Sequence, residues 1–205
     1  MLSSFSFFSF FTILAVQPRV MRIISGKFGS RQLTGTPPPG LRPTSDKLRE
    51  TIFNILGPRI EDAIFLDACA GMGGIGIEAI SRGAQFVHFV ESSRKACEII
   101  RKNLSTLAVQ SGFQILPVEL RRALQQFEKD NIAFDIAFLD PPYDHEDLYT
   151  MALEFFGAGS LLREAGILMM EHSKRHNLNP AAGVLRRYRL LNQGDSCLSF
   201  YRKDA

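Results

Sequence analysis

The tetrapeptide Asp140-Pro141-Pro142-Tyr143 follows directly after the apolar run 134–139, which is typical of a buried β-strand. An exocyclic amine of a nucleobase is a poor nucleophile, because its lone pair is delocalised into the ring. The Asp140 carboxylate and the Pro141 carbonyl could each accept one N–H and draw that nitrogen towards tetrahedral geometry. Two consecutive prolines restrict the backbone, which lowers the entropy cost of aiming the carbonyl. Tyr143 could stack on a base that has left its helix. The pattern indicates alkylation of a nucleobase amine, with a strand-ending turn as the structural alternative.

A glycine-rich turn lies upstream, between two further apolar runs. The run 64–66 ends in Asp67, glycines stand at positions 71, 73 and 76, and a helical stretch continues through Ser81. Glycines permit a tight strand-to-helix turn and a close backbone approach to a ligand. The next run, 86–90, ends in Glu91, where an acid can hold ribose hydroxyls. This context predicts a site for a nucleotide-like cofactor.

The position of the first glycine distinguishes between cofactors. Dinucleotide-binding turns place it directly after the strand, whereas Gly71 follows Asp67 by four residues. This spacing resembles motif I of S-adenosylmethionine (SAM) methyltransferases. The resemblance implies that Asp67 lies near the methionine ammonium and that Glu91 binds the ribose. Glu119, after a weak third strand, would approach the adenine. The predicted cofactor-binding residues are Asp67, Ala70, Gly71, Gly73, Gly76, Glu91 and Glu119.

Composition and cysteine spacing exclude several classes of protein. The chain has 205 residues, of which 45% are hydrophobic and 22% charged, as expected for one globular domain with a real core. Cys69, Cys97 and Cys197 have the spacing of neither a disulfide framework nor a zinc site. We expect no metal, because the sulfonium of SAM already activates the methyl group, and we expect Cys69 to be a small filler in the turn.

Charge is distributed unevenly along the chain. The front segment, residues 19–59, has eight Lys and Arg against two Asp and Glu, a net charge of +6, whereas residues 60–205 carry −3. This imbalance predicts that the front segment contacts a polyanion, with a solvated basic surface as the alternative. The predicted RNA-binding residues are Arg22, Lys27, Arg31, Arg42, Lys47 and Arg49. If their charges are only solvated surface, the RNA would dock elsewhere, for example on Arg186, Arg187 and Arg189.

The order of the predicted elements favours an α/β fold of the Rossmann-like class. Residues 22–33 predict a basic β-hairpin, and a helix begins near Thr44 or Ser45. From Ile64 to Leu168 strands and helices alternate, which is typical of a parallel sheet covered on both faces. The runs 185–191 and 196–201 predict an antiparallel hairpin at its far end. We therefore expect a seven-stranded, mostly parallel sheet with a C-terminal antiparallel hairpin.

The helix predicted after Ser45 has one apolar stripe, formed by Leu48, Ile52, Ile55 and Leu56. Arg49 and Phe53 lie off that stripe and need another partner. The cofactor pocket or RNA would serve, and a wider contact with the core is the alternative.

Residues 1–20 differ from the rest of the chain. Their first sixteen residues carry no charge, are interrupted by serines, and fit neither a secretory signal nor a membrane span. We expect translation to begin at Met21, with a disordered or membrane-touching extension as the alternative. The expected methyltransferase domain is 21–205, divided into an RNA-contacting part, 21–59, and a SAM-binding core, 60–205.

Four segments together resemble the bacterial RsmD family, which methylates guanine N2 in small-subunit ribosomal RNA. These segments are Arg22-Ile-Ile-Ser-Gly, the Arg42-Pro-Thr-Ser-Asp-Lys-Leu-Arg-Glu helix start, Leu66-Asp-Ala-Cys-Ala-Gly-Met-Gly-Gly, and Phe138-Leu-Asp-Pro-Pro-Tyr. The resemblance runs from Met21 to about Tyr201 and implies a cytoplasmic, monomeric enzyme acting on ribosomal RNA or the small subunit. It departs from the family at Glu119, where Asn or Asp is expected, and at the extra glycine Gly74.

Three other functions remain open from the residues alone. A DNA adenine-N6 methyltransferase uses the same Asp-Pro-Pro-Tyr chemistry, but the chain has no obvious sequence-reading domain. A protein glutamine methyltransferase would favour Asn at position 140. A non-catalytic RNA-binding assembly factor would not require complete motifs at both sites.

Overall fold

The computed structural model describes residues 21–35, 45–142 and 145–204. Residues 1–20, the predicted helix cap Thr44 and two predicted site residues, Arg42 and Tyr143, lie outside this part of the chain. The helices are α1 (Asp46–Leu56), η1 (Gly57–Ile60), α2 (Gly74–Ser81), α3 (Arg94–Thr106), α4 (Leu120–Lys129) and α5 (Glu146–Gly157). The strands are β1 (Ile64–Ala68), β2 (Phe86–Val90), β3 (Phe113–Leu116), β4 (Phe134–Leu139), β5 (Leu162–Ser173), β6 (Ala181–Ala182), β7 (Leu185–Gln193) and β8 (Ser196–Lys203).

The strands form one sheet in the order β3-β2-β1-β4-β5-β8-β7-β6. Strands β1 to β5 are parallel, and β8 pairs antiparallel with both β5 and β7. The Rossmann-like class and the C-terminal hairpin are therefore confirmed. The sheet has eight strands instead of the expected seven, because the two-residue β6 pairs with the outer edge of β7.

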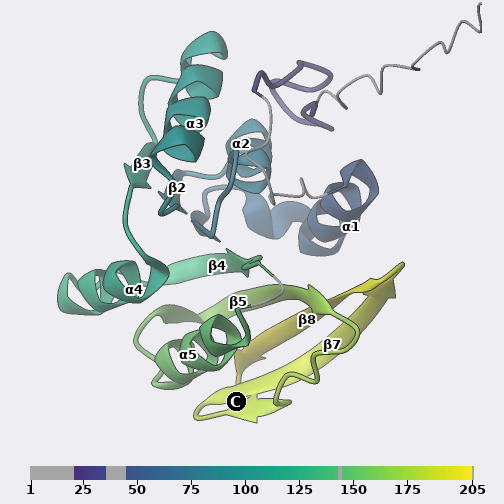
Figure 1. The fold of residues 1–205 in the computed structure, drawn as a ribbon, viewed down its shortest axis with the longest axis vertical. Coiled ribbons are helices and arrows are strands. Elements are labelled where there is room, and N and C mark those ends of the chain that lie inside the picture. Colours follow the sequence, from purple (N-terminus) through teal and green to yellow (C-terminus); the bar gives the residue numbers. More distant parts are fainter. Residues whose placement is uncertain (1–20, 36–44, 143–144, 205) are drawn as a thin grey trace, which may run out of the picture.

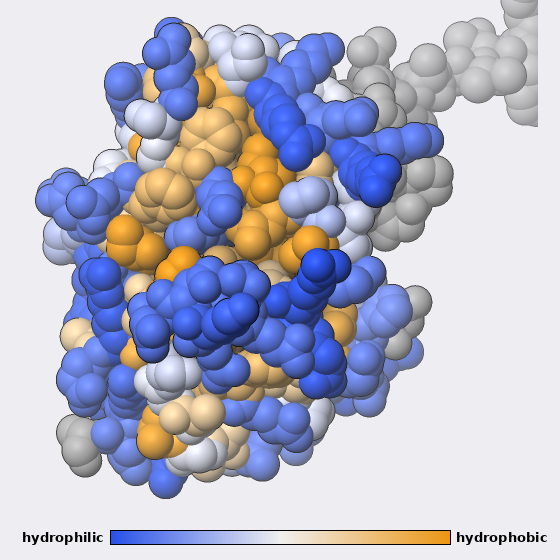
Figure 2. All heavy atoms as spheres, turned by 90° about the vertical axis from the view of Figure 1, so that its left-hand side faces the viewer, coloured by the Kyte–Doolittle hydropathy of each residue, from blue (hydrophilic) through white to orange (hydrophobic). Residues whose placement is uncertain are grey.

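Alternating side chains along the central strands divide the core into two layers. Phe65, Phe89 and Phe138 pack with α1, α2 and α3 on one face, whereas Leu66 and Leu139 pack with α4 and α5 on the other. Figure 1 shows these two helix layers above and below the sheet. Figure 2 shows hydrophobic surface between α3 and α4, at the level of the edge strand β3. Because β1, β2 and β4 are parallel, the loops that follow them all lie at one edge of the sheet.

The start of the front segment is a tight antiparallel turn and not the predicted pair of strands. Its only bridge in the described part of the segment joins Arg22 to Gln32, flanked by backbone bonds such as Ser30 N to Ile23 O at 2.8 Å. The apolar side chains Ile23, Phe28 and Leu33 are buried against the core. Because this turn packs onto helices instead of a neighbouring strand, its pairing does not extend into a ladder.

Helix α1 begins where Ser45 caps it, since the Ser45 side chain accepts a hydrogen bond from Leu48 N at 3.2 Å. The predicted stripe is buried at Leu48, Ile52 and Leu56. Phe53 is buried as well and stacks on Phe65 of β1, so the apolar face of α1 is wider than the stripe alone.

Candidate active site at the carboxyl edge of the sheet

Three residues of the β1–α2 turn have a left-handed backbone conformation, with positive φ. Cys69, Gly71 and Gly73 have φ values of 61°, 54° and 79°, and Gly73 is the N-cap of α2. At Gly76, a Cβ atom would lie 2.2 Å from the ring of Phe89, so only glycine lets α2 approach β2 this closely. The Asp67 carboxylate accepts a hydrogen bond from Gly76 N at 2.8 Å. The glycine pattern thus positions an acid of β1 against the first turn of α2.

Glu91 closes the other side of this turn. Its Oε2 accepts a hydrogen bond from Gly71 N at 2.8 Å and its Oε1 accepts one from Ser93 N at 2.7 Å. Ala70, which precedes Gly71, is fixed to the end of β2, because its N–H donates to Val90 O at 2.9 Å. Each carboxylate oxygen of Glu91 keeps a lone pair, so the acid can still accept hydroxyl groups from a ligand.

Acidic groups from four strand ends surround Cys69. Burial raises the pKa of its thiol far above the usual range, and the negative charges of Glu91, Asp140, Asp67 and Glu119 raise that pKa further. Burial also raises the pKa of Asp67 to about 8; the nearby Glu91 adds to this rise, and the Gly76 hydrogen bond opposes it. The edge where β1, β2 and β4 end is therefore a place that disfavours anions and favours a cationic ligand.

The turn after β4 lies beside the β1–α2 turn. Asp140 N donates to Ala68 O at 3.4 Å, and His145 N donates to Pro142 O at 3.0 Å before α5 begins. Pro141 is buried. Glu119 is exposed and forms the N-cap position of α4 without a side-chain capping bond, three residues beyond the end of β3. The acids predicted for two different tasks therefore meet at a single edge.

Four of the basic residues predicted to bind RNA are exposed: Arg22, Lys27, Arg31 and Lys47. Lys27 Nζ and the Arg31 guanidinium lie 5.4 and 5.7 Å from the centre of the Phe28 ring. Arg22 contacts Asp46 at 3.1 Å, which offsets part of its charge. These cations are available to a polyanion.

Arg49 is different, because its side chain is buried and does not reach the surface where a bound RNA would lie. Its side chain is 0% exposed and its Nη2 donates to Arg22 O at 2.6 Å and to Asp46 Oδ1 at 2.7 Å. Its Nη1 lies 3.6 Å from Oε2 of Glu78, which is also 0% exposed. The wider core contact, which was the alternative, holds because α1 packs this side chain against α2.

Glu78 is a residue that the sequence reasoning missed. Its carboxylate accepts hydrogen bonds from Ile24 N at 2.7 Å, Ser25 N at 3.0 Å and Arg82 Nε at 2.8 Å. It therefore anchors the front segment to the helix that follows the glycine turn. The only sequence signal was an acid within the otherwise apolar helix 74–81.

Comparisons with known proteins agree with this geometry. A family model described as conserved hypothetical protein 95 matches residues 21–202. Ribosomal RNA small subunit methyltransferase D of Escherichia coli (strain K12) is 33% identical over 175 residues, which are 84% of this chain and 86% of that protein. The chain belongs to the RsmD family.

Two further similar proteins match over most of their length. The putative rRNA methyltransferase YlbH of Bacillus subtilis is 36% identical over 89% of this chain and 99% of its own. The solved structure of the putative methyltransferase yhhF from Escherichia coli is 30% identical, with a TM-score of 0.79 over 90% of this chain and 98% of that one. The prediction of a methyltransferase with a Rossmann-like fold is confirmed.

Two features are absent from the described residues. No helix among residues 21–35, 45–142 and 145–204 is long and apolar enough to cross a membrane. The same ranges contain no group of three His, Cys, Asp or Glu side chains placed to hold a metal ion.

Proposed function

We propose that this chain transfers the methyl group of SAM to the N2 amine of a guanine in small-subunit ribosomal RNA. The observation that supports this most directly is the junction of two turns at one sheet edge, where Asp140 N bonds Ala68 O beside the acid-lined glycine turn. A methyl donor held over β1 and β2 would face an amine held after β4. The RsmD relatives, named for ribosomal RNA of the small subunit, indicate the substrate.

The residues of the glycine turn fit SAM. Its methionine ammonium and its sulfonium are both cations, and the four acids around Cys69 favour positive charge. Asp67 is buried with its pKa raised to about 8, so a neighbouring ammonium would stabilise its ionised form. Glu91 would accept the ribose hydroxyls. The proposed cofactor-binding residues are Asp67, Ala70, Gly71, Gly73, Gly76, Glu91 and Glu119.

The target amine would be activated by the turn after β4. When bound, SAM supplies an electrophilic methyl group. The Asp140 carboxylate and the Pro141 carbonyl each accept one N–H of the guanine amine, so the nitrogen lone pair is directed at that methyl. As the new N–C bond forms, the methyl–sulfur bond would break and S-adenosylhomocysteine would leave. The nitrogen would be positive until it releases one proton, and the Asp140 carboxylate would stabilise this charge. Tyr143 stacks on the guanine, which must leave its helix to reach the edge.

RNA would be bound through phosphates on the front segment. The proposed contacts are Arg22, Lys27, Arg31 and Lys47, which are exposed, together with Arg42. Arg49 does not belong to this set, because it is buried and paired with Glu78. We propose that the protein works in the cytoplasm as a monomer.

Mapping of modified nucleosides in ribosomal RNA tests the function. Small-subunit RNA from cells with and without this protein is digested and analysed by mass spectrometry. We expect one N2-methylguanosine to disappear on deletion, to return with the native chain, and to stay absent with Asp140→Asn. Loss of N6-methyladenine from DNA would point to the DNA adenine enzyme, and unchanged methylation together with a subunit assembly defect would point to an assembly factor.

A further inference from the structure

A basic pocket lies at the same edge of the sheet as the two turns, beyond β5. It has a volume of about 420 Å³. Lys174 and Arg187 are its cations, and no acid is among the described residues that line it. The lining residues are His172, Lys174, His176, Asn177, Arg187, Leu190, Asn192 and Cys197. None of them belongs to the cofactor or target site proposed above.

The strand register places this pocket next to the target turn. Leu139 of β4 pairs with Met170 of β5, so His172 continues β5 as Pro141 continues β4. The other walls come from β8 and β7, the next strands in the sheet. Since neighbouring strands are about 4.8 Å apart, the backbone of His172 lies about one strand spacing from that of Pro141, whereas Arg187 is in register with Ala137, four residues before Pro141. The proposed cofactor residues Asp67 and Glu91 lie on the opposite side of β4.

This arrangement constrains the path of a bound RNA strand. A nucleotide whose base reaches Asp140 must connect to its neighbours along the sheet edge. Towards β1 and β2 the edge would hold SAM. Towards β5 it presents Lys174, directly after the end of that strand, whereas Arg187 pairs with Tyr201 opposite Leu168, further from the edge. Exposed cations follow on both sides of β4: Arg94, Lys95, Arg121 and Arg122 begin α3 and α4 on the cofactor side, and Lys174 follows β5, the strand next to β4, on the other side.

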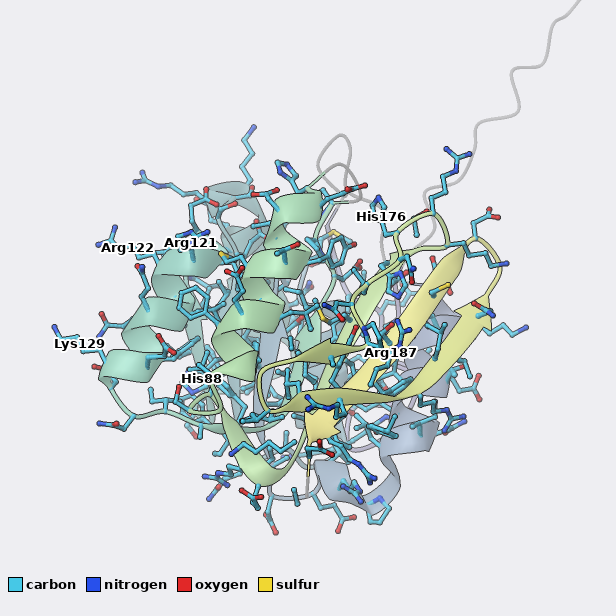
Figure 3. The ribbon with its side chains drawn as sticks, turned by 90° about the horizontal axis from the view of Figure 1, so that it is seen from below. His88, Arg121, Arg122, Lys129, His176 and Arg187 are labelled. Carbon is cyan, nitrogen blue, oxygen red and sulfur yellow. The ribbon has the colours of Figure 1, made fainter. Side chains whose placement is uncertain are left out.

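Side-chain contacts fix the segment between β5 and β6, which supplies one side of the pocket. His176 Nε2 lies 2.8 Å from Oε1 of Glu146, the first residue of α5 after the target turn. Tyr201 Oη donates to Asn179 O at 2.9 Å, and Arg187 Nη1 donates to Leu178 O at 3.1 Å. Figure 3 shows His176 and Arg187 on the side of the sheet that α5 covers. The segment between β5 and β6 is thus pinned to β7, to β8 and to α5.

The charge of the pocket at neutral pH comes from Lys174 and Arg187. His172 is buried, with Nε2 at 2.9 Å from Ser199 Oγ and Nδ1 at 3.0 Å from Ser173 O. Burial lowers the pKa of His172, and the nearby Arg187 lowers it further, against the hydrogen bond to Ser173. Its imidazole is therefore neutral and lines the pocket as a hydrogen-bonding group. Leu190 adds an apolar side chain that is 47% exposed and can contact a sugar or base.

We propose that this pocket binds the backbone phosphates of the nucleotides next to the target guanine, and so positions the strand for the turn after β4. Cations and neutral donors without a carboxylate suit a phosphodiester, which needs charge-assisted hydrogen bonds. The inference rests on the proposed function, because it takes the target to be a nucleotide in RNA. Lys174 and Arg187 are positioning residues, since they touch the strand and not the reacting atoms.

Lys174→Gln is the variant that tests this proposal, and Arg175→Gln is its matched control. Both side chains are exposed neighbours in the chain, but only Lys174 lines the pocket. The substrates are small ribosomal subunits, and RNA extracted from them, purified from cells that lack this protein. We expect Lys174→Gln to raise KM for the RNA about tenfold, with kcat and the Kd for SAM within twofold. The log–log salt slope of RNA binding should flatten by about 0.7–0.9, as for one lost phosphate contact.

Lys174→Arg should restore the native KM, because it keeps the charge, and Arg175→Gln should behave as the native chain. An unchanged KM and salt slope in Lys174→Gln, or an equal effect of Arg175→Gln, would overturn the proposal that the pocket binds RNA phosphates. A fall in kcat with an unchanged KM would also overturn it, since the residue would then act on chemistry. If the native chain methylates neither substrate, the proposed function fails first, and this outcome is distinct from failure of the pocket alone.

Discussion

Replacement of Arg49 by methionine separates a role in the core from a role in RNA binding. Methionine fills part of the same space without a charge. The change removes the hydrogen bonds to Arg22 O and Asp46 Oδ1 and one of the two arginines beside the buried Glu78 carboxylate. Removal of one partner from a buried ion pair costs about 3–5 kcal/mol, because the other charge stays buried.

The lower end of that range applies here. Glu78 keeps Arg82 Nε at 2.8 Å and two backbone N–H donors, so it is not left without partners. Two nitrogens of Arg49, Nε and Nη1, are themselves buried without a hydrogen-bond partner in the described structure, and the substitution removes them. We therefore expect the free energy of unfolding to fall by about 3 kcal/mol. For a chain of this size, this corresponds to a melting temperature lower by about 6–12 °C.

Urea unfolding and a salt-dependent RNA titration measure the two roles. The control is Lys47→Met on the same helix, where the side chain is exposed, and its stability should stay within about 0.5 kcal/mol of the native chain. A double-mutant cycle with Glu78→Gln should give a coupling of about 0.5–3 kcal/mol. If Arg49→Met is as stable as the native chain but binds RNA as weakly as Lys47→Met, the burial argument is refuted. Arg49 would then be an RNA-binding residue.

Three further predictions concern the cofactor and the RNA. Asp67→Ala and Glu91→Ala should each weaken SAM binding by about 1.5–3 kcal/mol, and unchanged calorimetric titrations of both folded variants would remove SAM from this turn. Because burial raises the pKa of Asp67 to about 8, SAM binding below that pH should release a proton, so its affinity should rise from about pH 6 to about pH 7.5, by at most about tenfold per unit. Asp67→Asn should abolish this pH dependence, and a dependence that persists in that variant would belong to another group. Neutralising Arg22, Lys27 and Arg31 together should flatten the log–log salt slope of RNA binding by about 0.7–0.9 per contact and leave SAM binding alone, whereas an unchanged slope would make their charges mere solvated surface.

The chemistry-bearing turns could be predicted from the sequence because they depend on local pattern. The run 134–139 is the strand β4 at both ends, and the run 64–66 begins β1, which continues to Ala68. Apolar runs bounded by an acid, glycines or prolines specify where a strand stops, and parallel strands stop at a shared edge. This is why Asp67, Glu91 and Asp140, which are far apart along the chain, could be assigned to one site.

Other features depend on which surfaces meet, and a one-dimensional pattern does not contain that information. Helical periodicity placed Arg49 off the apolar stripe of α1, but only the packing of α1 against α2 gives it Glu78 as a buried partner. The front segment reads as two strands, yet it finds a helix and not a strand edge to pair with, so its pairing stops at one bridge.

The basic pocket beyond β5 is the clearest product of tertiary structure. His172 lies one residue before the end of β5, Lys174 and His176 lie in the segment that follows, and Arg187 and Cys197 come from two later strands. They meet because β8 pairs with both β5 and β7, and β7 runs in the same direction as β5, so that β7 ends and β8 begins at the carboxyl edge. The sequence predicts β5, β7 and β8 from their own residues, but their order in the sheet depends on the free energy of packing whole faces together.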